Sequence, residues 1–259
     1  DWRIAISYAI DRDAISEGYY LGESLPRNSL PETTHPFYPG PEYERKFGTY
    51  EPELANSMLD DIMGPKDSEG FRTLANGDRF EFVISARDAY ASMTAGAELL
   101  CRDIQQVGVR CLPEVLGGSL LSQRGKDNEI MGKTTWAMGA ADLYVYSGVT
   151  LPVRAGGTWG AEWGKWYSSA GKEGEEPPAE VMRLYDLFKN AGLTKDGAVN
   201  NAREIHKWIV DNKVMTGVVG GIGSYGMVVV DNDLANWPAF YANRVTLNTP
   251  NTAFPEQFW

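Results

Sequence analysis

The chain has 259 residues, of which 43% are apolar, and its 35 acidic against 24 basic residues give a formal net charge of −11. This length suggests one large or two modest domains with a substantial core. The sequence has neither an apolar run of the roughly 18 to 20 residues that span a bilayer nor a basic block, which argues against a membrane helix and a nucleic-acid partner. We expect a neutral or zwitterionic small molecule as the partner.

The first part of the chain predicts helices that are separated by an extended passage. Residues 2–10 have the apolar density of a buried helix, and Asp11 can cap a second short helix. The proline-rich residues 26–52 are expected to run extended over the surface. Pro52 opens a further helix, which ends before Gly64 and the proline that follows it.

The next part predicts an α/β arrangement. Residues 79–84 alternate as a strand does, residues 90–107 carry a helical apolar stripe that ends at Gly108, and residues 109–115 form a second strand. Strand, helix and strand with a tight return make a βαβ unit, so the two strands should be parallel. A third strand is expected over residues 129–136.

An aromatic, glycine-rich segment follows, from residue 134 to residue 178. It holds four of the eight tryptophans, and much of it lacks both helical periodicity and sustained strand alternation, so it predicts a long surface loop. Its rings either pack on one another and fix the loop, or cover a flat, partly apolar ligand. Ligands gather at the carboxyl ends of strands in open α/β sheets, and this segment begins at such an end.

The last part predicts two helices, at 179–190 and 197–212, followed by β-rich stretches at 214–219 and 226–230. Beyond them the tail is rich in Asn and Pro and shows little periodicity. Such a tail is unusual at the end of a self-contained domain, so we expect it to pack against something absent from this sequence.

The two cysteines, Cys101 and Cys111, have a spacing that matches no zinc or redox motif. Two separately buried thiols are the expected state, and a disulfide is the alternative if the protein is exported. The two histidines, His35 and His206, are interpreted as structural, so neither a metal nor another cofactor is predicted.

Several short stretches resemble, in the same order, a known family of receptors. They are Asp1–Arg12 (DWRIAISYAIDR), Glu51–Ala55, Asp67–Phe71, the βαβ unit ending at Gly108 and Val109, the strand that carries Trp136, Ala202–Ile205, Asn236–Pro238 and Pro255–Phe258. The sequence resembles the family 5 extracellular solute-binding proteins, the oligopeptide, dipeptide, nickel and oligosaccharide receptors of bacterial ABC importers. No single motif is diagnostic, but the ordered matches cover nearly the whole chain.

This resemblance implies a periplasmic-binding-protein-like lobe, with a mixed sheet flanked by helices. Residues 1–213 would form lobe II, and residues 214–259 would cross the hinge to a lobe I that is largely missing, so the chain would be a C-terminal fragment. The opening Asp1 in place of Met fits a processed or excised piece. The resemblance also implies a monomeric, non-enzymatic protein that is periplasmic or extracellular. It would be associated with the membrane through an ABC permease or through a lipid anchor outside this chain.

The resemblance further indicates the ligand-binding residues. Many peptide-binding relatives hold the ligand's ammonium group with an aspartate shortly after the tryptophan-bearing strand, and Asp142 is the candidate here. Its larger separation from Trp136 departs from that pattern and favours a neutral ligand such as a sugar, to whose hydroxyls Asp142, Glu162 or Arg154 would bond. The predicted ligand-binding set is Trp136, Asp142, Tyr144, Trp159, Trp163 and Trp166.

Two other functions remain open at this point. A carbohydrate-active hydrolase would use Asp142 and Glu162 as its carboxylate pair beside aromatic subsites, although only the residue types favour it. A structural or interaction domain would bury the aromatic rings against one another.

Overall fold

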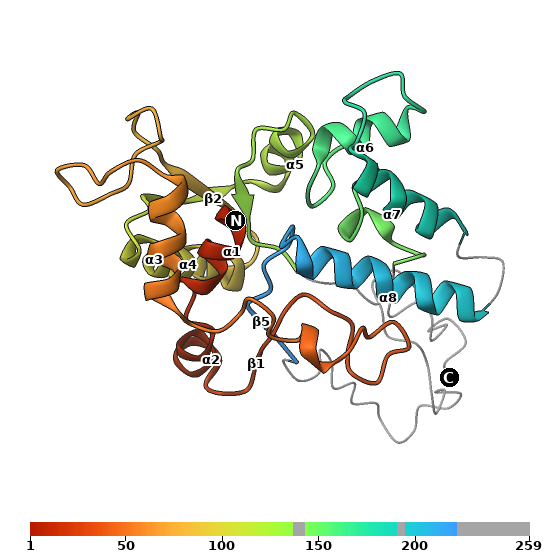
Figure 1. The fold of residues 1–259 in the computed structure, drawn as a ribbon, viewed down its shortest axis with the longest axis horizontal. Coiled ribbons are helices and arrows are strands. Elements are labelled where there is room, and N and C mark those ends of the chain that lie inside the picture. The colour runs from red at the N-terminus through yellow and green to blue at the C-terminus, as the bar shows by residue number, and fades with distance from the viewer. Residues whose placement is uncertain (137–142, 191–194, 222–259) are drawn as a thin grey trace, which may run out of the picture. The chain divides into compact units, whose positions relative to one another are not determined.

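Helices surround two small sheets in the part of the chain that the structure describes, residues 1–136, 143–190 and 195–221 (Figure 1). The structure is a computed structural model. The helices are α1 (Trp2–Tyr8), α2 (Arg12–Tyr20), α3 (Pro52–Ile62), α4 (Ala91–Gln106), α5 (Gly118–Lys126), α6 (Ala161–Ser168), α7 (Ala179–Lys189) and α8 (Lys195–Asp211). The strands are β1 (Leu25–Pro26), β2 (Phe82–Arg87), β3 (Cys111–Leu116), β4 (Gly132–Lys133) and β5 (Val219–Gly220).

The main sheet has the order β3-β2-β4, and β2 pairs in parallel with both neighbours. The register aligns Phe82 with Cys111 on β3 and Ile84 with Gly132 on β4. Helix α4 connects β2 to β3 and returns through Gly108, whose φ of 76° is easily reached only without a side chain. The predicted βαβ unit, the parallel pairing and the α/β fold class are confirmed.

Two strand boundaries were predicted wrongly. Strand β2 begins at Phe82 rather than at residue 79, because Arg79 forms an antiparallel bridge with Thr73 in a preceding turn. The strand expected at 129–136 pairs only at Gly132 and Lys133, with one further bond from the Thr134 amide to the Ser85 carbonyl. Its alternation is therefore shorter than the sequence suggested.

The side chains of β2 alternate between an apolar face and a polar face of the sheet. Phe82, Ile84 and Ala86 are buried in a core that includes residues of α1, α3 and α4. Side chains alternate along a strand, so Ser85 and Arg87 lie on the opposite face. On that face Ser85 donates to Glu114 of β3, which is also paired with Arg124 of α5. Helix α5 therefore covers the polar face.

A second core joins α7, α8 and the segment between residues 143 and 153. Its fully buried members are Leu143, Leu151, Leu184, Ala202, Ile205 and Ile209. The Tyr185 hydroxyl donates to the Pro152 carbonyl at 2.6 Å, and burial raises the pKa of this phenol well above its usual value. This core fixes the aromatic segment to two helices.

The aromatic segment was predicted to be a largely irregular surface loop, but its residues Ala161–Ser168 form α6. Gly160 adopts φ 60° before the helix, and Gly164 lets it approach the Arg154 backbone, where a Cβ would lie 2.1 Å from the carbonyl oxygen. Gly164, which the sequence suggested as part of a loop, instead allows close packing of a helix against the backbone.

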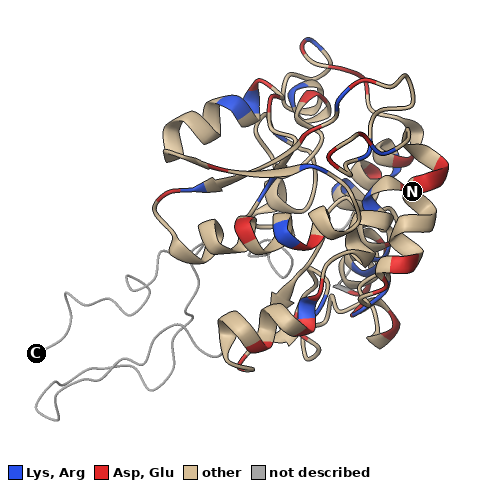
Figure 2. Ribbon diagram, turned by 90° about the vertical axis from the view of Figure 1, so that its left-hand side faces the viewer, with Lys and Arg blue, Asp and Glu red and all other residues tan. Residues whose placement is uncertain are grey.

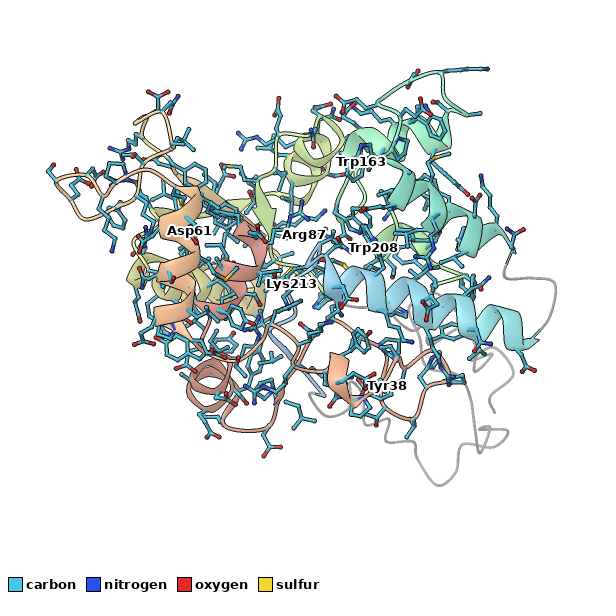
Figure 3. The ribbon with its side chains drawn as sticks, viewed as in Figure 1. Tyr38, Asp61, Arg87, Trp163, Trp208 and Lys213 are labelled. Carbon is cyan, nitrogen blue, oxygen red and sulfur yellow. A yellow bond between two sulfur atoms is a disulfide. The ribbon has the colours of Figure 1, made fainter. Side chains whose placement is uncertain are left out.

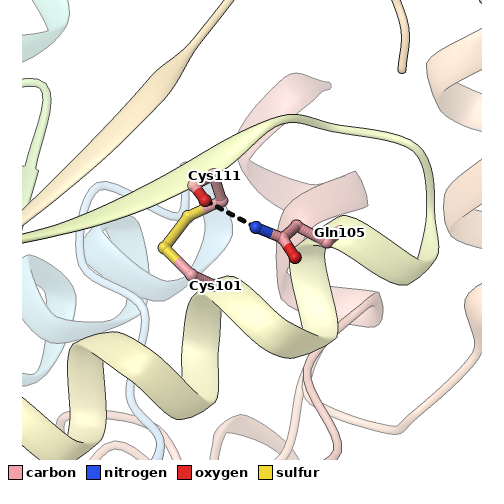
Figure 4. The surroundings of a disulfide bond; sticks show 3 residues. All are labelled: Cys101, Gln105 and Cys111. Carbon is pink, nitrogen blue, oxygen red and sulfur yellow. Dashed lines mark hydrogen bonds between the residues drawn. A yellow bond between two sulfur atoms is a disulfide. The ribbon is translucent and has the colours of Figure 1, made fainter. Parts of the chain in front are cut away.

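The expectation of two separate thiols was also wrong, because Cys101 and Cys111 form a disulfide (Figure 4). Cys101 lies in the last part of α4 and Cys111 begins β3. The tight return between them brings the two Cα atoms to 4.9 Å, within the range that a disulfide requires. Both side chains are buried in the first core.

The segment that follows α8 is held against the beginning of the chain. The buried Arg12 donates from Nε to the Gly217 carbonyl at 2.9 Å, and Lys213 Nζ donates to Asn28 Oδ1 at 2.6 Å. Strand β5 pairs antiparallel with β1. The β-rich stretch predicted at 226–230 lies outside the described residues.

Lys213 makes the folded state sensitive to pH. Burial, with a smaller contribution from the Arg12 cation, lowers the pKa of Lys213 from 10.5 to about 7. Between these values the unfolded chain holds a proton that the folded chain lacks, so the free energy of unfolding rises with pH, by roughly 1 kcal/mol per pH unit. Urea unfolding near pH 7.5 and near pH 9 should show this gain, and Lys213→Met should lose it. An equal gain in both proteins would contradict the assignment.

Candidate functional site

The carboxyl ends of the three parallel strands meet at one edge of the main sheet. Strand β2 ends at Arg87, β3 at Leu116 and β4 at Lys133, and the chain continues from β4 to Trp136. Ligands of open α/β sheets bind beyond this edge. We call the surface formed here by Arg87, Tyr90, Lys133 and Trp136 the carboxyl edge.

An aromatic pair and an arginine form one part of the carboxyl edge. The Tyr90 and Trp136 rings lie 4.4 Å apart between centroids, edge to face, and the Arg87 guanidinium lies 5.4 Å from the Tyr90 centroid. Trp136 keeps 38% of its surface exposed. The edge therefore offers an accessible ring beside a cation, which suits stacking on a flat ligand.

Lys133 and Arg154 form the other part. The Lys133 ammonium donates to the Gly157 carbonyl at 3.1 Å, which ties β4 to the aromatic segment. Burial, followed by repulsion from Arg154, lowers the pKa of Lys133. Arg154 lies over the Tyr146 ring, with its guanidinium carbon 5.5 Å from the centroid. The carboxyl edge is thus locally basic on an acidic chain.

Three of the predicted ligand-binding tryptophans lie elsewhere, on or beside α6. The Trp159 and Trp163 rings meet edge to face at 6.1 Å, and Trp159 also stacks on Trp208 of α8 at 5.9 Å. The Trp159 indole donates to the Thr150 carbonyl at 3.0 Å. Figure 3 labels Arg87 at the end of β2, Trp163 in α6 and Trp208 in α8. Trp166 is half-buried beside Gly171.

The remaining predicted residues also have structural contacts. Tyr144 stacks on Phe188 at 5.7 Å and donates its hydroxyl to the Ala198 carbonyl at 2.7 Å, and burial raises its pKa to about 12. Glu162 pairs with Lys165 within α6 at 2.6 Å. Asp142 lies outside the described residues.

Tyr144→Phe is expected to lower the free energy of unfolding by about 1 kcal/mol, because the Ala198 carbonyl loses its donor while the stacking on Phe188 remains. Urea unfolding of the two proteins measures the difference. A variant as stable as the parent would show that the hydroxyl bond contributes nothing to the fold.

The sequence did not identify Arg87, Tyr90 or Lys133 as site residues. Arg87 could have been found, because the predicted parallel strand at residues 79–84 places it close to a carboxyl end of the sheet. Tyr90 instead was assigned to the start of the helix. The Lys133 contact depends on a turn 24 residues later, which local patterns do not reveal.

An apolar groove of about 400 Å³ lies at the opposite, amino end of the sheet. Trp2, Phe80, Phe82, Met63 and Met131 line part of it. The lining has no charged side chain and only the Trp2 indole as an N–H donor, so the carboxyl edge is the better candidate site.

Charges of both signs alternate over the described ribbon, with no long stretch of one sign (Figure 2). Among these residues, no group of three or more His, Cys, Asp and Glu side chains is placed to hold a metal ion. Nor does any helix there combine the length and apolar character that crossing a membrane requires.

Comparison with known proteins identifies the family of this chain. Residues 1–148 match the family described as bacterial extracellular solute-binding proteins, family 5 Middle. The chain belongs to the family 5 bacterial extracellular solute-binding proteins. Members of this family are binding proteins and are periplasmic or extracellular. No curated protein sequence matches the chain.

Solved structures show the same fold. An oligopeptide-binding protein OppA is similar over 100% of this chain and 43% of its own, with 26% identity and a TM-score of 0.77. A periplasmic oligopeptide-binding protein from Thermotoga maritima, solved with mannohexaose, is similar over 92% of this chain and 43% of its own, at 18% identity and a TM-score of 0.66. MelB from Agrobacterium fabrum, solved with stachyose, is similar over 84% of this chain and 33% of its own, at 17% identity and a TM-score of 0.63. The family 5 chain spans less than half the length of these structures.

Proposed function

We propose that this family 5 chain is part of the substrate-binding receptor of a bacterial ABC importer, which captures an oligopeptide or oligosaccharide between two lobes and delivers it to a membrane permease. Residues 1–213 supply lobe II, and residues 214–259 cross the hinge to lobe I. The chain is then the C-terminal fragment of a longer, non-enzymatic and monomeric receptor.

The exposed Trp136 at the carboxyl edge is the observation that supports ligand binding best. Trp136 lies beside Tyr90 at the edge of the sheet beyond which ligands of open α/β sheets bind. Its ring is exposed, whereas Trp159 packs against the second core. The relatives solved with mannohexaose and stachyose bind sugars, and OppA is named for oligopeptides, so both ligand classes occur in similar folds.

The predicted ligand-binding residues divide into two groups under this proposal. Trp136 stacks on the ligand at the carboxyl edge, and Asp142, six residues later, bonds to hydroxyls or to an ammonium group. Trp163 and Trp166 extend the binding surface along α6, whereas Trp159 and Tyr144 support it through their contacts with Trp208 and Phe188.

Hinge closure drives capture, by analogy with periplasmic binding proteins, for which this motion is a standard example. A ligand can favour the closed form only through contacts that the open form lacks. One lobe alone retains part of these contacts. Losing about 4 kcal/mol of them weakens binding about a thousandfold, so this chain alone should bind weakly.

Intrinsic tryptophan fluorescence tests the proposal. The chain, and a receptor of the relatives' full length that contains it, would be titrated with pools of short peptides and of oligosaccharides. We expect a saturable change in the longer receptor at ligand concentrations that leave this chain unchanged. A response to sugars identifies a carbohydrate receptor and a response to peptides supports the ammonium role of Asp142. Silence of the longer receptor in both pools would contradict the proposal.

The hydrolase alternative gains no support from the described geometry, because Glu162 is paired with Lys165 on a short helix and Asp142 lies outside the described residues. Turnover of chromogenic glycosides that is lost in Glu162→Gln would establish it and overturn the receptor proposal.

A further inference from the structure

We infer that Arg87 is a specificity-determining residue that binds a carboxylate group of the ligand, with Tyr90 and Trp136 covering the part of the ligand next to it. This inference rests on the proposed receptor function and narrows its ligand to one that carries an acidic group.

The position of Arg87 is fixed by packing rather than by an ion pair. Its guanidinium lies over the Tyr90 ring, 5.4 Å from the centroid, and close to Gly118. A Cβ on Gly118 would come within 2.7 Å of the Arg87 Nε, so a larger residue there would displace the guanidinium. Trp136 continues the same surface, 4.4 Å from Tyr90. The guanidinium thus lies between Tyr90 and Gly118 on a surface that Trp136 extends.

Arg87 has no ion pair or side-chain hydrogen bond with the residues that the structure describes. Other arginines of the chain do have such partners: Arg72 pairs with Asp60, and Arg110 with Asp67 and Glu69. Arg87 is exposed at the end of β2, so its donors are free to meet a molecule from solution.

Neighbouring charges on the same face favour an anion. Glu114 of β3 is neutralised by Arg124 at 2.9 Å and accepts from Ser85, so it does not compete for Arg87. Asp88 lies in the turn that follows β2, with its Oδ2 3.8 Å from the position that a Cβ would take on Gly117. Lys133 and Arg154 add positive charge along the edge. An approaching carboxylate therefore meets the cations Arg87, Lys133 and Arg154 along this edge, with Asp88 as a nearby exposed acid.

The chemistry of guanidinium then specifies the ligand group. Its planar donors match the two oxygens of a carboxylate and form parallel charge-assisted hydrogen bonds. The adjoining aromatic rings suit an apolar or ring-shaped part of the ligand. Two sources carry this chemistry: the terminal or side-chain carboxylate of a peptide, and the uronic acid of an acidic oligosaccharide.

NMR titration of the longer receptor that contains this chain tests the inference, with the Trp136 indole and Gly118 amide signals as readouts. The probes form two matched pairs: trialanine with trialanine amide, and trigalacturonate with maltotriose. We expect the acidic member of at least one pair to bind at least about tenfold more tightly than its neutral partner. Arg87→Gln should reduce that preference to near equality, whereas Arg183→Gln, which removes an exposed arginine from α7, should keep it.

A preference within the peptide pair identifies a peptide carboxylate, and one within the sugar pair identifies a uronate; either supports the inference. Binding of neutral probes without any preference, or a preference that survives Arg87→Gln, would overturn the role of Arg87 and leave the receptor function intact. If no probe shifts either signal although the longer receptor responds in the fluorescence titration, the role of Arg87 and ligand binding at the carboxyl edge are rejected, and the receptor function stands.

Discussion

Replacing both Cys101 and Cys111 with alanine is expected to lower the free energy of unfolding by about 3 kcal/mol. The disulfide closes a loop between residues 10 positions apart, joining the end of α4 to the start of β3, and its loss restores conformational freedom to the unfolded chain. Both sulfur atoms belong to the first core, so their removal also reduces packing there. Urea unfolding of the parent and of the double variant measures the difference.

Treatment with dithiothreitol supplies the control for this experiment. The parent should lose a similar stability on reduction, whereas the double variant should not respond. Such a response fits an exported protein that folds where disulfides form, as members of this family do. A parent whose stability is the same with and without reductant would contradict a disulfide in the folded protein.

Arg12→Met is expected to lower the free energy of unfolding by about 3 to 5 kcal/mol. Arg12 is 1% exposed and donates to the carbonyl groups of Ser7, Ile10, Gly48 and Gly217, as well as to the Ser7 hydroxyl. Methionine fills part of the space but leaves these buried acceptors without a donor. The cost is that of unsatisfied polar groups rather than of a cavity.

Hydrogen exchange separates this local role from general destabilisation. Arg12→Met should expose the amides around Gly217 to exchange earlier than those of α4, because Arg12 fixes the segment after α8 to α1 and α2. Arg183→Met, at an exposed site of α7, should change neither stability nor exchange there. An Arg12 variant as stable as this control would show that Arg12 does not hold the segment.

The local patterns of the sequence were sufficient for much of the first half of the fold. Asp11 caps α2 by accepting from the Ala14 amide, Pro52 opens α3, and β2, α4 and β3 form the expected parallel unit. These features depend on neighbours in sequence or on a period of 2 or 3.6 residues, so one sequence reveals them.

The structure of the aromatic segment could not be predicted from such local patterns. Its glycines indicated a loop, yet Gly164 serves a helix that approaches the Arg154 backbone, and Trp159 stacks on Trp208 of a helix that begins far along the chain. Which rings are covered is decided by these distant contacts. The sequence could therefore propose Trp136, Trp159, Trp163 and Trp166 together but could not separate the exposed Trp136 from the packed Trp159.

The disulfide and the surroundings of Arg87 could not be predicted from the sequence for a similar reason. The distance between Cys101 and Cys111 depends on the geometry of the return after α4, which residue spacing does not fix. Arg87 gains its role from Gly118 of the next strand-to-helix turn and from Trp136 beyond β4, which the parallel sheet brings to one edge.

Ligand binding at the carboxyl edge can be tested most directly by NMR mapping of the eight tryptophan indole signals. The signals would be assigned with single Trp→Phe variants and followed during titration with a ligand selected from the peptide and oligosaccharide pools. We expect the largest shift at Trp136 and no shift at Trp2, which lines the groove at the other end of the sheet. A shift at Trp2 with none at Trp136 would contradict binding at the carboxyl edge.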